Sequence, residues 1–256
     1  MSALSASNLT VSLGTKEIVR DASLSLDAGE LVALVGPNGA GKTTLMRALA
    51  GLVPARGTIT FADKPLGVLS PRERARMVSY LPQGHVFYWP ISVESIVMLG
   101  RTPHADPFSS VSPDDRAAVA HALAITETQG FAERAVTTLS GGEKARVALA
   151  RALATQAPVL LADEPTAALD PRHQLVVMEL LREAARRGNA ILAIMHDLTL
   201  AARFADRVLV MNEGRIVAGG APAEALAPEL LASVFGIEAA TVEVGGKHVP
   251  IAGRAL

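Results

Sequence analysis

A glycine-rich loop stands early in the chain, between an apolar run and a segment of helix-forming residues. Residues 36–44 fit the pattern G-x-x-x-x-G-K-[ST], with Lys42 and Thr43 at its last two positions. The preceding Leu31–Val35 predicts a buried strand, and the following Lys42–Ala50 predicts a helix. This is the strand–loop–helix context that the motif requires, and an ordinary glycine-rich turn would not meet all of these demands together. The loop is therefore expected to hold the phosphates of a nucleotide.

The chemistry of this loop follows from its residue types. Glycines let the backbone curl so that successive N–H groups point at one anion, and the helix N-terminus adds a favourable dipole. Lys42 places a positive charge near the β- and γ-phosphates, and the Thr43 hydroxyl can hold Mg²⁺. The predicted phosphate-binding residues are Gly36, Pro37, Asn38, Gly39, Ala40, Gly41, Lys42, Thr43 and Thr44.

A second apolar run ends in two acidic residues. Val159–Ala162 predicts a buried strand, and Asp163 and Glu164 follow it directly. Such an acidic strand end could simply cap the next helix. In a chain that also carries Lys42 and Thr43, however, Asp163 is expected to position Mg²⁺ and Glu164 to polarise an attacking water.

The bulk properties fit one large α/β domain and exclude several other classes. The chain has 256 residues and a formal net charge of −1, which gives no positive field for non-specific nucleic-acid binding. It has no cysteine, so disulfides and thiolate metal sites are excluded. We expect no cleavable signal peptide, because residues 1–10 are mixed and polar, and no apolar run approaches the ~20 residues of a membrane span. A cytoplasmic protein is expected.

The order of predicted elements defines a core with two subdomains. Residues 7–35 are rich in strand signals and predict an N-terminal antiparallel β subdomain. Strand signals disappear over 84–155, which is interpreted as a helical subdomain inserted into the core. Residues 219–256 predict one helix over 222–235 and a β-like tail. The expected fold class is α/β: a phosphate-loop NTPase core with both subdomains, forming a single domain over 1–256.

The segment Leu139–Glu143 has two interpretations. Ser140 and Glu143 form the capping box S-x-x-E at the start of a predicted helix, and the glycines between them ease the turn. That role would be purely structural. Two adjacent glycines at a helix start also expose N–H groups to an anion. These residues alone leave the choice open.

Taken in order, the motifs resemble those of the ATPase subunit of ABC transporters. Walker A is Gly36–Thr43, the signature is Leu139–Glu143 followed by Ala150–Leu153, and Walker B is Val159–Asp163 followed by Glu164. The Q-loop glutamine is Gln83, the D-loop is Ala168–Asp170 and the switch histidine is His196. The resemblance covers nearly the whole chain, and few other families combine Walker A with this signature.

The resemblance implies Mg²⁺-dependent ATP hydrolysis by a head-to-tail dimer. Each ATP would lie between Walker A of one copy and Ser140–Gly142 of the other. The implied nucleotide-binding residues outside Walker A are Leu139, Ser140, Gly141, Gly142, Glu143 and Asp170. The implied catalytic residues are Glu164, His196 at the γ-phosphate, Gln83 at the metal or the attacking water, and Lys42. The implied metal-binding residues are Thr43, Gln83 and Asp163.

Three positions depart from the family pattern. Leu13 stands where members usually carry an aromatic residue that stacks on adenine, so base selectivity is expected to be weak. Ala145 replaces a frequent glutamine before Arg146, which could loosen contacts around the signature helix. Ala167–Ala168 replaces a small polar pair, and we expect a minor effect there.

An aromatic segment follows Gln83. Val86–Pro90 contains three contiguous aromatic residues. They could pack inside the helical subdomain. Because aromatic residues are enriched at interface hot spots, the alternative hypothesis is that Tyr88 or Trp89 contacts a coupling helix of a membrane permease.

A further stretch indicates which transporter the ATPase serves. Val93–His104, and above all Gly100–His104, resembles importer ATPases for iron-siderophore, haem and cobalamin, as does Gly219–Val234. The plain alternative is a helix-capping glycine and a proline stop, with His104 incidental. No other metal-ligand residues cluster near His104 in the sequence, so it is not a predicted metal ligand.

The resemblance as a whole implies an ATP-hydrolysing subunit that powers import of a metal chelate. Its partners would be a second copy, an integral-membrane permease and indirectly a solute-binding protein, but no nucleic acid. It would lie peripherally on the cytoplasmic face of the cell membrane. The alternatives are an importer for another solute, a soluble mechanochemical ABC ATPase and a non-hydrolytic nucleotide-binding switch. The chain shows none of the long insertions that the mechanochemical class needs, and Glu164 and His196 argue against the switch.

Overall fold

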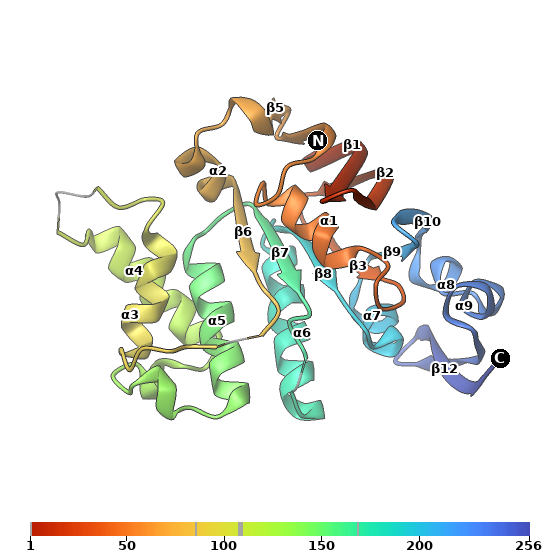
Figure 1. Ribbon diagram of the computed structural model, residues 1–256. Coiled ribbons are helices and arrows are strands. Elements are labelled where there is room, and N and C mark those ends of the chain that lie inside the picture. The colour runs from red at the N-terminus through yellow and green to blue at the C-terminus, as the bar shows by residue number, and fades with distance from the viewer. Residues whose placement is uncertain (1, 85, 107–109, 168) are drawn as a thin grey trace. The chain divides into compact units, whose positions relative to one another are not determined.

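The computed structural model describes residues 2–84, 86–106, 110–167 and 169–256. The chain forms two compact units, which can be followed by colour in Figure 1. Unit 1 comprises Met1–Val68 and Arg182–Leu256, and unit 2 comprises Leu69–Leu181. The boundary at residue 181 falls inside helix α6 (Pro171–Arg186).

Unit 1 contains most of the strands. They are β1 (Ser2–Leu13), β2 (Lys16–Asp27), β3 (Leu31–Val35), β4 (Arg56–Phe61), β5 (Lys64–Pro65), β8 (Ala190–Ile194), β9 (Arg207–Asn212), β10 (Arg215–Gly220), β11 (Ile237–Val244) and β12 (Lys247–Ala255). Its helices are α1 (Lys42–Leu49), α7 (Leu198–Phe204), α8 (Pro222–Ala225) and α9 (Pro228–Phe235).

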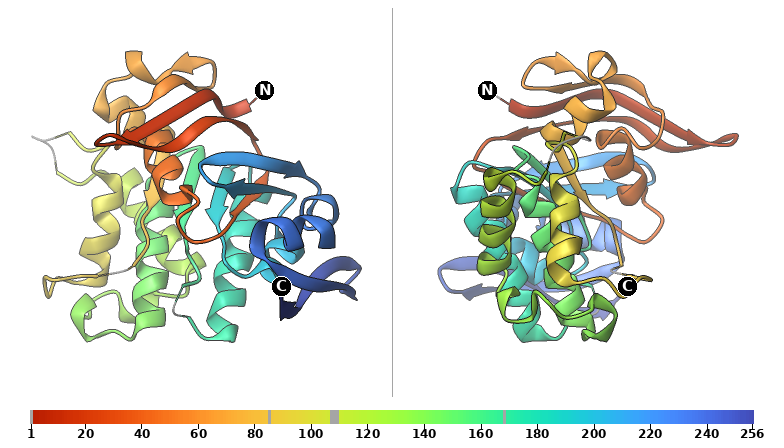
Figure 2. Two further views of the ribbon diagram at one scale, coloured as in Figure 1. Left: turned by 45° about the vertical axis from the view of Figure 1, so that its right-hand side comes forward. Right: turned by 90° about the vertical axis from the view of Figure 1, so that its left-hand side faces the viewer.

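The N-terminal strands form an antiparallel sheet in the order β2-β1-β4-β5. Figure 2 shows β1 and β2 side by side as a long red hairpin, whose closing pair is Leu13 opposite Lys16. Alternate residues of these strands point inward, as expected for a sheet with one covered face, and Leu4, Leu26 and Phe61 are fully buried. The predicted antiparallel β subdomain is confirmed.

A second group of strands in unit 1 carries the phosphate loop. β3 pairs in parallel with β8 on one side and with β9 on the other, and β10 returns antiparallel to β9. Every residue of β3 and β8 is buried, which explains why both read as continuous apolar runs. The loop 36–44 leaves β3 at its carboxyl end, the edge at which α/β sheets bind ligands.

Unit 2 is largely helical. Its elements are α2 (Pro71–Met77), β6 (Val78–Leu81), α3 (Val93–Met98), the 3₁₀ turn η2 (Leu99–Arg101), α4 (Pro113–Ile125), α5 (Gly141–Ala154), β7 (Val159–Asp163) and the first part of α6. β6 and β7 pair in parallel. Figure 1 shows α3, α4 and α5 side by side, and their shared core includes Val97, Leu123 and Val147. Between 84 and 155 the described residues form no strand beyond an isolated bridge of Ser92 with Ala135.

The C-terminal region differs in part from the prediction. The single helix expected over 222–235 is wrong, because α8 ends at Ala225 and α9 starts at Pro228. A proline inside a helix lacks the N–H donor and clashes with the preceding turn, so it starts a new helix instead. The predicted β-like tail is confirmed as the antiparallel hairpin of β11 and β12. Figure 1 shows β12 beside α7, where Thr199 Oγ1 donates to the Pro250 carbonyl at 3.1 Å.

No helix in the described ranges has both the length and the apolar character needed to cross a bilayer.

Candidate nucleotide site

The predicted site residues divide between the two units. Unit 1 holds the loop 36–44, Leu13 and His196, whereas unit 2 holds Gln83, Leu139–Glu143, Asp163, Glu164 and Asp170. Ala168 lies outside the described residues, so the predicted D-loop is seen only at Leu169 and Asp170.

Close backbone approaches fix the shape of the phosphate loop. A Cβ atom added to Gly36 would lie 2.0 Å from the Met211 carbonyl oxygen, and one added to Gly41 would lie 2.9 Å from the Ile18 carbonyl oxygen. Gly41 is also the N-cap residue of α1, with a φ of 102°. Glycine has no side chain with which to cap a helix, and a helix N-terminus of this kind is suited to binding an anion.

Lys42 lies within the curve of the loop. It is only 6% exposed, and its Nζ donates to the carbonyl oxygens of Gly36 at 2.7 Å and Pro37 at 2.9 Å. A buried ammonium group needs such partners to offset the loss of water. The structure therefore brings the positive charge and the helix N-terminus together, as the motif predicts.

The first acid of Walker B is enclosed in unit 2. Asp163 is fully buried at the end of β7, and the Tyr80 hydroxyl donates to its Oδ2 at 3.0 Å. Tyr80 lies on β6, which pairs with β7. Our sequence analysis missed Tyr80, because its role depends on the parallel register of two strands far apart in the chain.

The second acid has an unusual backbone conformation. Glu164 adopts a φ of 52°, a left-handed conformation that costs roughly 1–2 kcal/mol for a residue with a Cβ. Gln83 Nε2 donates to Glu164 Oε2 at 2.6 Å. Two of the predicted catalytic residues of unit 2 are therefore in direct contact. Strained non-glycine residues of this kind cluster at functional sites.

The signature begins helix α5 with the predicted capping box. Ser140 N donates to Glu143 Oε2 at 2.8 Å, and Glu143 N donates to Ser140 Oγ at 3.3 Å. The bond from Ser140 N also holds the pKa of Glu143 below its usual value. Leu139 is buried in the helical core, so only its backbone could reach a nucleotide. The capping role is thus present, and it leaves Ser140 and Gly141 exposed.

A histidine that our sequence analysis missed lies between the D-loop and the signature. His173 N donates to Asp170 Oδ1 at 3.0 Å, and His173 Nδ1 donates to Asp170 Oδ2 at 2.6 Å. These bonds lower the pKa of Asp170. The ring also lies beside Gly142, whose added Cβ would be 3.6 Å from the ring atom Cγ. A histidine three residues after an N-capping aspartate was the available signal.

The remaining two residues of unit 1 are more open. His196 is exposed just after β8, and Asp197 caps α7 by accepting a bond from Leu200 N at 2.9 Å. Leu13 is 53% exposed at the tip of the β1–β2 hairpin. Its weak stacking on adenine stays a prediction.

The aromatic segment after Gln83 is split between core and surface. Phe87 packs against the helical core, whereas Tyr88 is 82% and Trp89 75% exposed. The packing alternative therefore holds for Phe87 alone. Large exposed aromatic side chains of this kind mark interaction surfaces more often than isolated aliphatic ones do.

The Gly100–His104 string holds the C-terminal end of the signature helix. Arg101 is buried and pairs with Asp115 at 2.8 Å, while its Nη1 donates to the Ala154 carbonyl at 2.8 Å. His104 Nε2 donates to the Thr155 carbonyl at 2.9 Å. Cationic and N–H donors at a helix C-terminus satisfy its last carbonyls. The string therefore has a structural role, and His104 takes part in it rather than being incidental.

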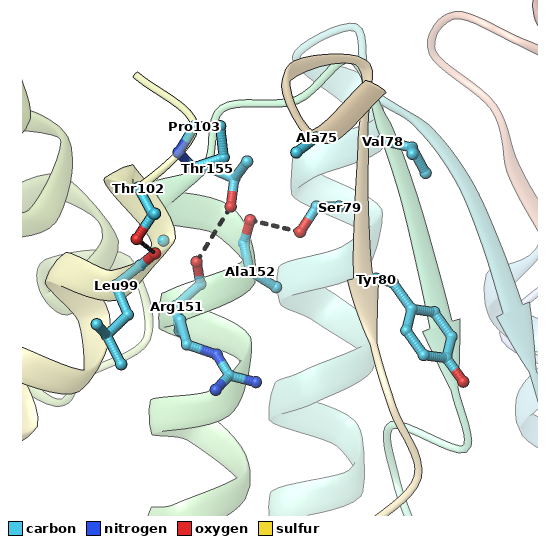
Figure 3. A pocket seen from close by; sticks show the side chains of 11 residues that line it. Ala75, Val78, Ser79, Tyr80, Leu99, Thr102, Pro103, Arg151, Ala152 and Thr155 are labelled. Carbon is cyan, nitrogen blue, oxygen red and sulfur yellow. Dashed lines mark hydrogen bonds between the residues drawn. The ribbon is translucent and has the colours of Figure 1, made fainter. Parts of the chain in front are cut away.

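A pocket of about 320 Å³ lies next to this string within unit 2 (Figure 3). Figure 3 shows Arg151 and Ala152 of α5, with its C-cap residue Thr155, between β6 and the Leu99–Pro103 segment. In its wall, Ser79 donates to the Ala152 carbonyl at 3.0 Å, and the Tyr80 hydroxyl donates to the Asp163 carboxylate. Apolar residues such as Val78 and Leu99 line the pocket together with Arg151.

Comparisons with known proteins agree with this architecture. The fold and the loop define a phosphate-loop ATPase, and a family profile described as ABC transporter matches residues 19–167. The hemin import ATP-binding protein HmuV of Streptomyces coelicolor is 49% identical over 231 residues, which are 90% of this chain and 82% of that protein. The cobalamin import ATP-binding protein BtuD of Halobacterium salinarum is 43% identical over 234 residues, 91% of this chain and 58% of that protein.

Solved structures give the same result. A chain of an inward-facing ABC transporter assigned to the metal-chelate type has a TM-score of 0.83 and 26% identity, covering 98% of both chains. A dimeric ATP-binding cassette in a post-hydrolysis state with ADP and Pi has a TM-score of 0.74 and 25% identity, covering 86% of this chain and 98% of that one. The chain belongs to the ABC transporter family and is an ABC ATPase. The resemblance inferred from the motifs is confirmed.

Proposed function

We propose that this ATPase powers the import of a metal chelate, with haem as the first candidate, through a membrane permease. The relatives named for hemin and cobalamin import support this solute class, as does the Gly100–His104 string. The main observation in favour of ATP binding is the loop 36–44. Its backbone surrounds the Lys42 ammonium group, and helix α1 begins there without a side-chain cap. On this proposal, the permease and a solute-binding protein select the solute.

The nucleotide would replace groups that now belong to the loop itself. Lys42 Nζ would exchange the Gly36 and Pro37 carbonyls for β- and γ-phosphate oxygens. The Thr43 hydroxyl and the buried Asp163 carboxylate are hard oxygen donors that suit Mg²⁺, and the Gln83 amide oxygen would complete the set. When bound, Mg²⁺ neutralises charge on the phosphates. Tyr80 holds the Asp163 carboxylate in a fixed orientation through its 3.0 Å bond.

Glu164 would act as the general base on the attacking water. Gln83 orients its carboxylate through the 2.6 Å bond, and His196 would contact the γ-phosphate. The test is Glu164→Gln, which should lower ATP hydrolysis on the order of 10³-fold while preserving ATP binding. Glu179→Gln, at an exposed position of α6, is the matched control and should hydrolyse ATP normally. Hydrolysis at the wild-type rate by the Glu164→Gln protein would refute the role of this carboxylate.

Hydrolysis would require two copies arranged head to tail. Leu139–Glu143 of one copy, with its Gly141 and Gly142 N–H groups, would close over the ATP held by the loop of the other, and Asp170 would contact the same interface. The dimeric ATP-binding cassette supports such an assembly. The dipole of α5, whose glycines lie at its N-terminus, favours a phosphate there.

Docking on the permease would place the protein on the cytoplasmic face of the membrane. The exposed Tyr88 and Trp89 are the proposed contact. Alanine at both positions should reduce co-purification with the permease and transport into vesicles by about tenfold or more, as for interface hot spots. Leu52→Ala, at an exposed position of unit 1, is the control. Full assembly and coupled ATPase activity in the double variant would exclude this surface.

The solute class can be tested on the assembled complex. Its ATPase activity should be stimulated by a binding protein loaded with haem, more than by the same protein loaded with cobalamin or a ferric siderophore. Stimulation by an unrelated solute alone would indicate a different importer.

A further inference from the structure

The D-loop carboxylate is held at both of its oxygens by one residue. The His173 backbone N–H donates to Asp170 Oδ1 at 3.0 Å, and its ring Nδ1 donates to Oδ2 at 2.6 Å. The second bond is short, as charge-assisted hydrogen bonds are. The Asp170 side chain remains 58% exposed, while that of His173 is only 26% exposed. The carboxylate is therefore fixed in orientation and still open toward solvent.

The same imidazole ring covers the second glycine of the signature. A Cβ atom added to Gly142 would lie 3.6 Å from both Cγ and Nδ1 of His173 and 3.8 Å from Cδ2. These nearly equal distances show that the flat side of the ring faces Gly142. A methyl group at that position would make an ordinary van der Waals contact with the ring, and all three residues belong to unit 2.

We infer that His173 is a positioning residue that fixes the D-loop carboxylate and the signature glycines relative to one another. This inference rests on the proposed function, in which both segments face the nucleotide of a second copy. Because the ring is hydrogen-bonded to Asp170 and lies beside Gly142, a displacement of the signature would move Asp170 as well. The two segments of a copy therefore engage the partner together.

A purely local role predicts something different. If His173 served only the N-terminus of α6, its loss would change the stability of the fold and nothing else. Two substitutions separate its contacts. His173→Asn keeps a side-chain donor near Asp170 but removes the ring from Gly142, and His173→Phe keeps a ring but loses the donor. Asparagine, phenylalanine and histidine have similar helix propensities, so α6 itself is not perturbed.

The test uses the full chain with Glu164→Gln as the parent, so that bound ATP is retained. The ATP concentration that gives half-maximal dimerisation is measured by light scattering, ATP binding to the monomer by fluorescence, and stability by thermal unfolding. Each His173 variant should need about tenfold more ATP to dimerise, the effect of losing a hydrogen bond or packing contact of ordinary strength. Monomer binding should not change, and the unfolding temperature should fall by too little to account for the shift in dimerisation. His248→Asn, at an exposed position of β12, is the control.

Two results would overturn the inference. If either His173 variant dimerises at the parent's ATP concentration, or shifts only in proportion to a lower unfolding temperature, His173 does not link the two segments. If the parent itself fails to dimerise with ATP, the proposed function fails, and the inference fails with it. The parent therefore distinguishes the two failures.

Discussion

Two glycine-rich helix starts, the loop 36–44 in unit 1 and the signature 139–143 in unit 2, differ in what requires their glycines. In the loop, a Cβ on Gly36 would lie 2.0 Å from a backbone carbonyl oxygen, and Gly41 has a φ of 102°. In the signature, a Cβ on Gly141 would meet no described atom within 4 Å, and Gly142 would make only ordinary contacts. The chain's own fold demands the first pair of glycines but not the second.

The two helix starts also differ in their capping. α1 begins at a glycine, which cannot cap it, whereas α5 has a complete capping box from Ser140 and Glu143. The first turn of α1 is thus suited to an anion, whereas that of α5 is satisfied by the chain's own side chains. On our proposal, the glycines of the signature let the ATP held by the other copy approach closely.

The largest effect is expected at Gly36. In Gly36→Ala the new methyl group would clash with the Met211 carbonyl oxygen. Because this oxygen belongs to the backbone, a side-chain rotation cannot relieve the clash. We expect a loss of about 3 kcal/mol or more in the free energy of unfolding, measured by urea denaturation. Gly39→Ala is the control, because Gly39 has a φ of 80° but no described atom within 4 Å of an added Cβ. It should lose only the conformational part, about 1–2 kcal/mol. Equal losses in both variants would contradict the steric argument.

The opposite pattern is expected at Gly141. Gly141→Ala should leave the free energy of unfolding within about 0.5 kcal/mol of wild type, because alanine favours a helix and the position is open. ATPase activity of the permease complex should nevertheless fall on the order of 10²-fold, the usual cost of losing a donor to a reacting anion.

Gly130→Ala provides the control for this variant. Gly130 lies in unit 2, and an added Cβ there would also meet no described atom within 4 Å. It should change neither stability nor activity. Full activity of the Gly141→Ala protein would show that no ligand approaches this glycine closely. The conclusion that a ligand requires the signature glycines would then be wrong.

What the sequence could reveal followed from local patterns. The strand and the helix that flank the loop 36–44 and the capping box at Ser140 carry their signals within a few residues, and the structure confirms them. The break before Pro228 also had a local signal, which we did not weigh against the helical pattern.

The missed features depend on contacts between distant residues. Tyr80 reaches Asp163 through the parallel register of β6 and β7, and Arg101 reaches Ala154 through the packing of α5. Neither pairing has a fixed spacing along the chain. The division of the aromatic segment into a core Phe87 and an exposed Trp89 likewise depends on where the helical core lies. Features that depend on neighbouring residues could therefore be predicted, whereas contacts between residues far apart in the sequence could not.

The smallest expected effect concerns the far end of the signature helix. Burial lowers the pKa of His104 from its ordinary 6.5, outweighing the bond to the Thr155 carbonyl that raises it, and Arg101 adds to the lowering. The unfolded chain therefore takes up the proton at a higher pH than the folded one. Stability contributed by the neutral ring is fully present above the ordinary pKa, is lost as the pH falls below it, and stops falling below the pKa of the folded state.

This dependence should appear as a difference between two proteins. Urea unfolding between pH 7.5 and pH 5 is compared for the wild type and for His104→Gln, which keeps a donor but cannot titrate in this range. The stability advantage of the wild type should shrink as the pH falls, whereas the exposed His248→Gln should track the wild type throughout. A pH-independent advantage would mean that His104 is not held neutral. Burial would then have no effect on the protonation of the side chain that holds the C-terminal end of α5.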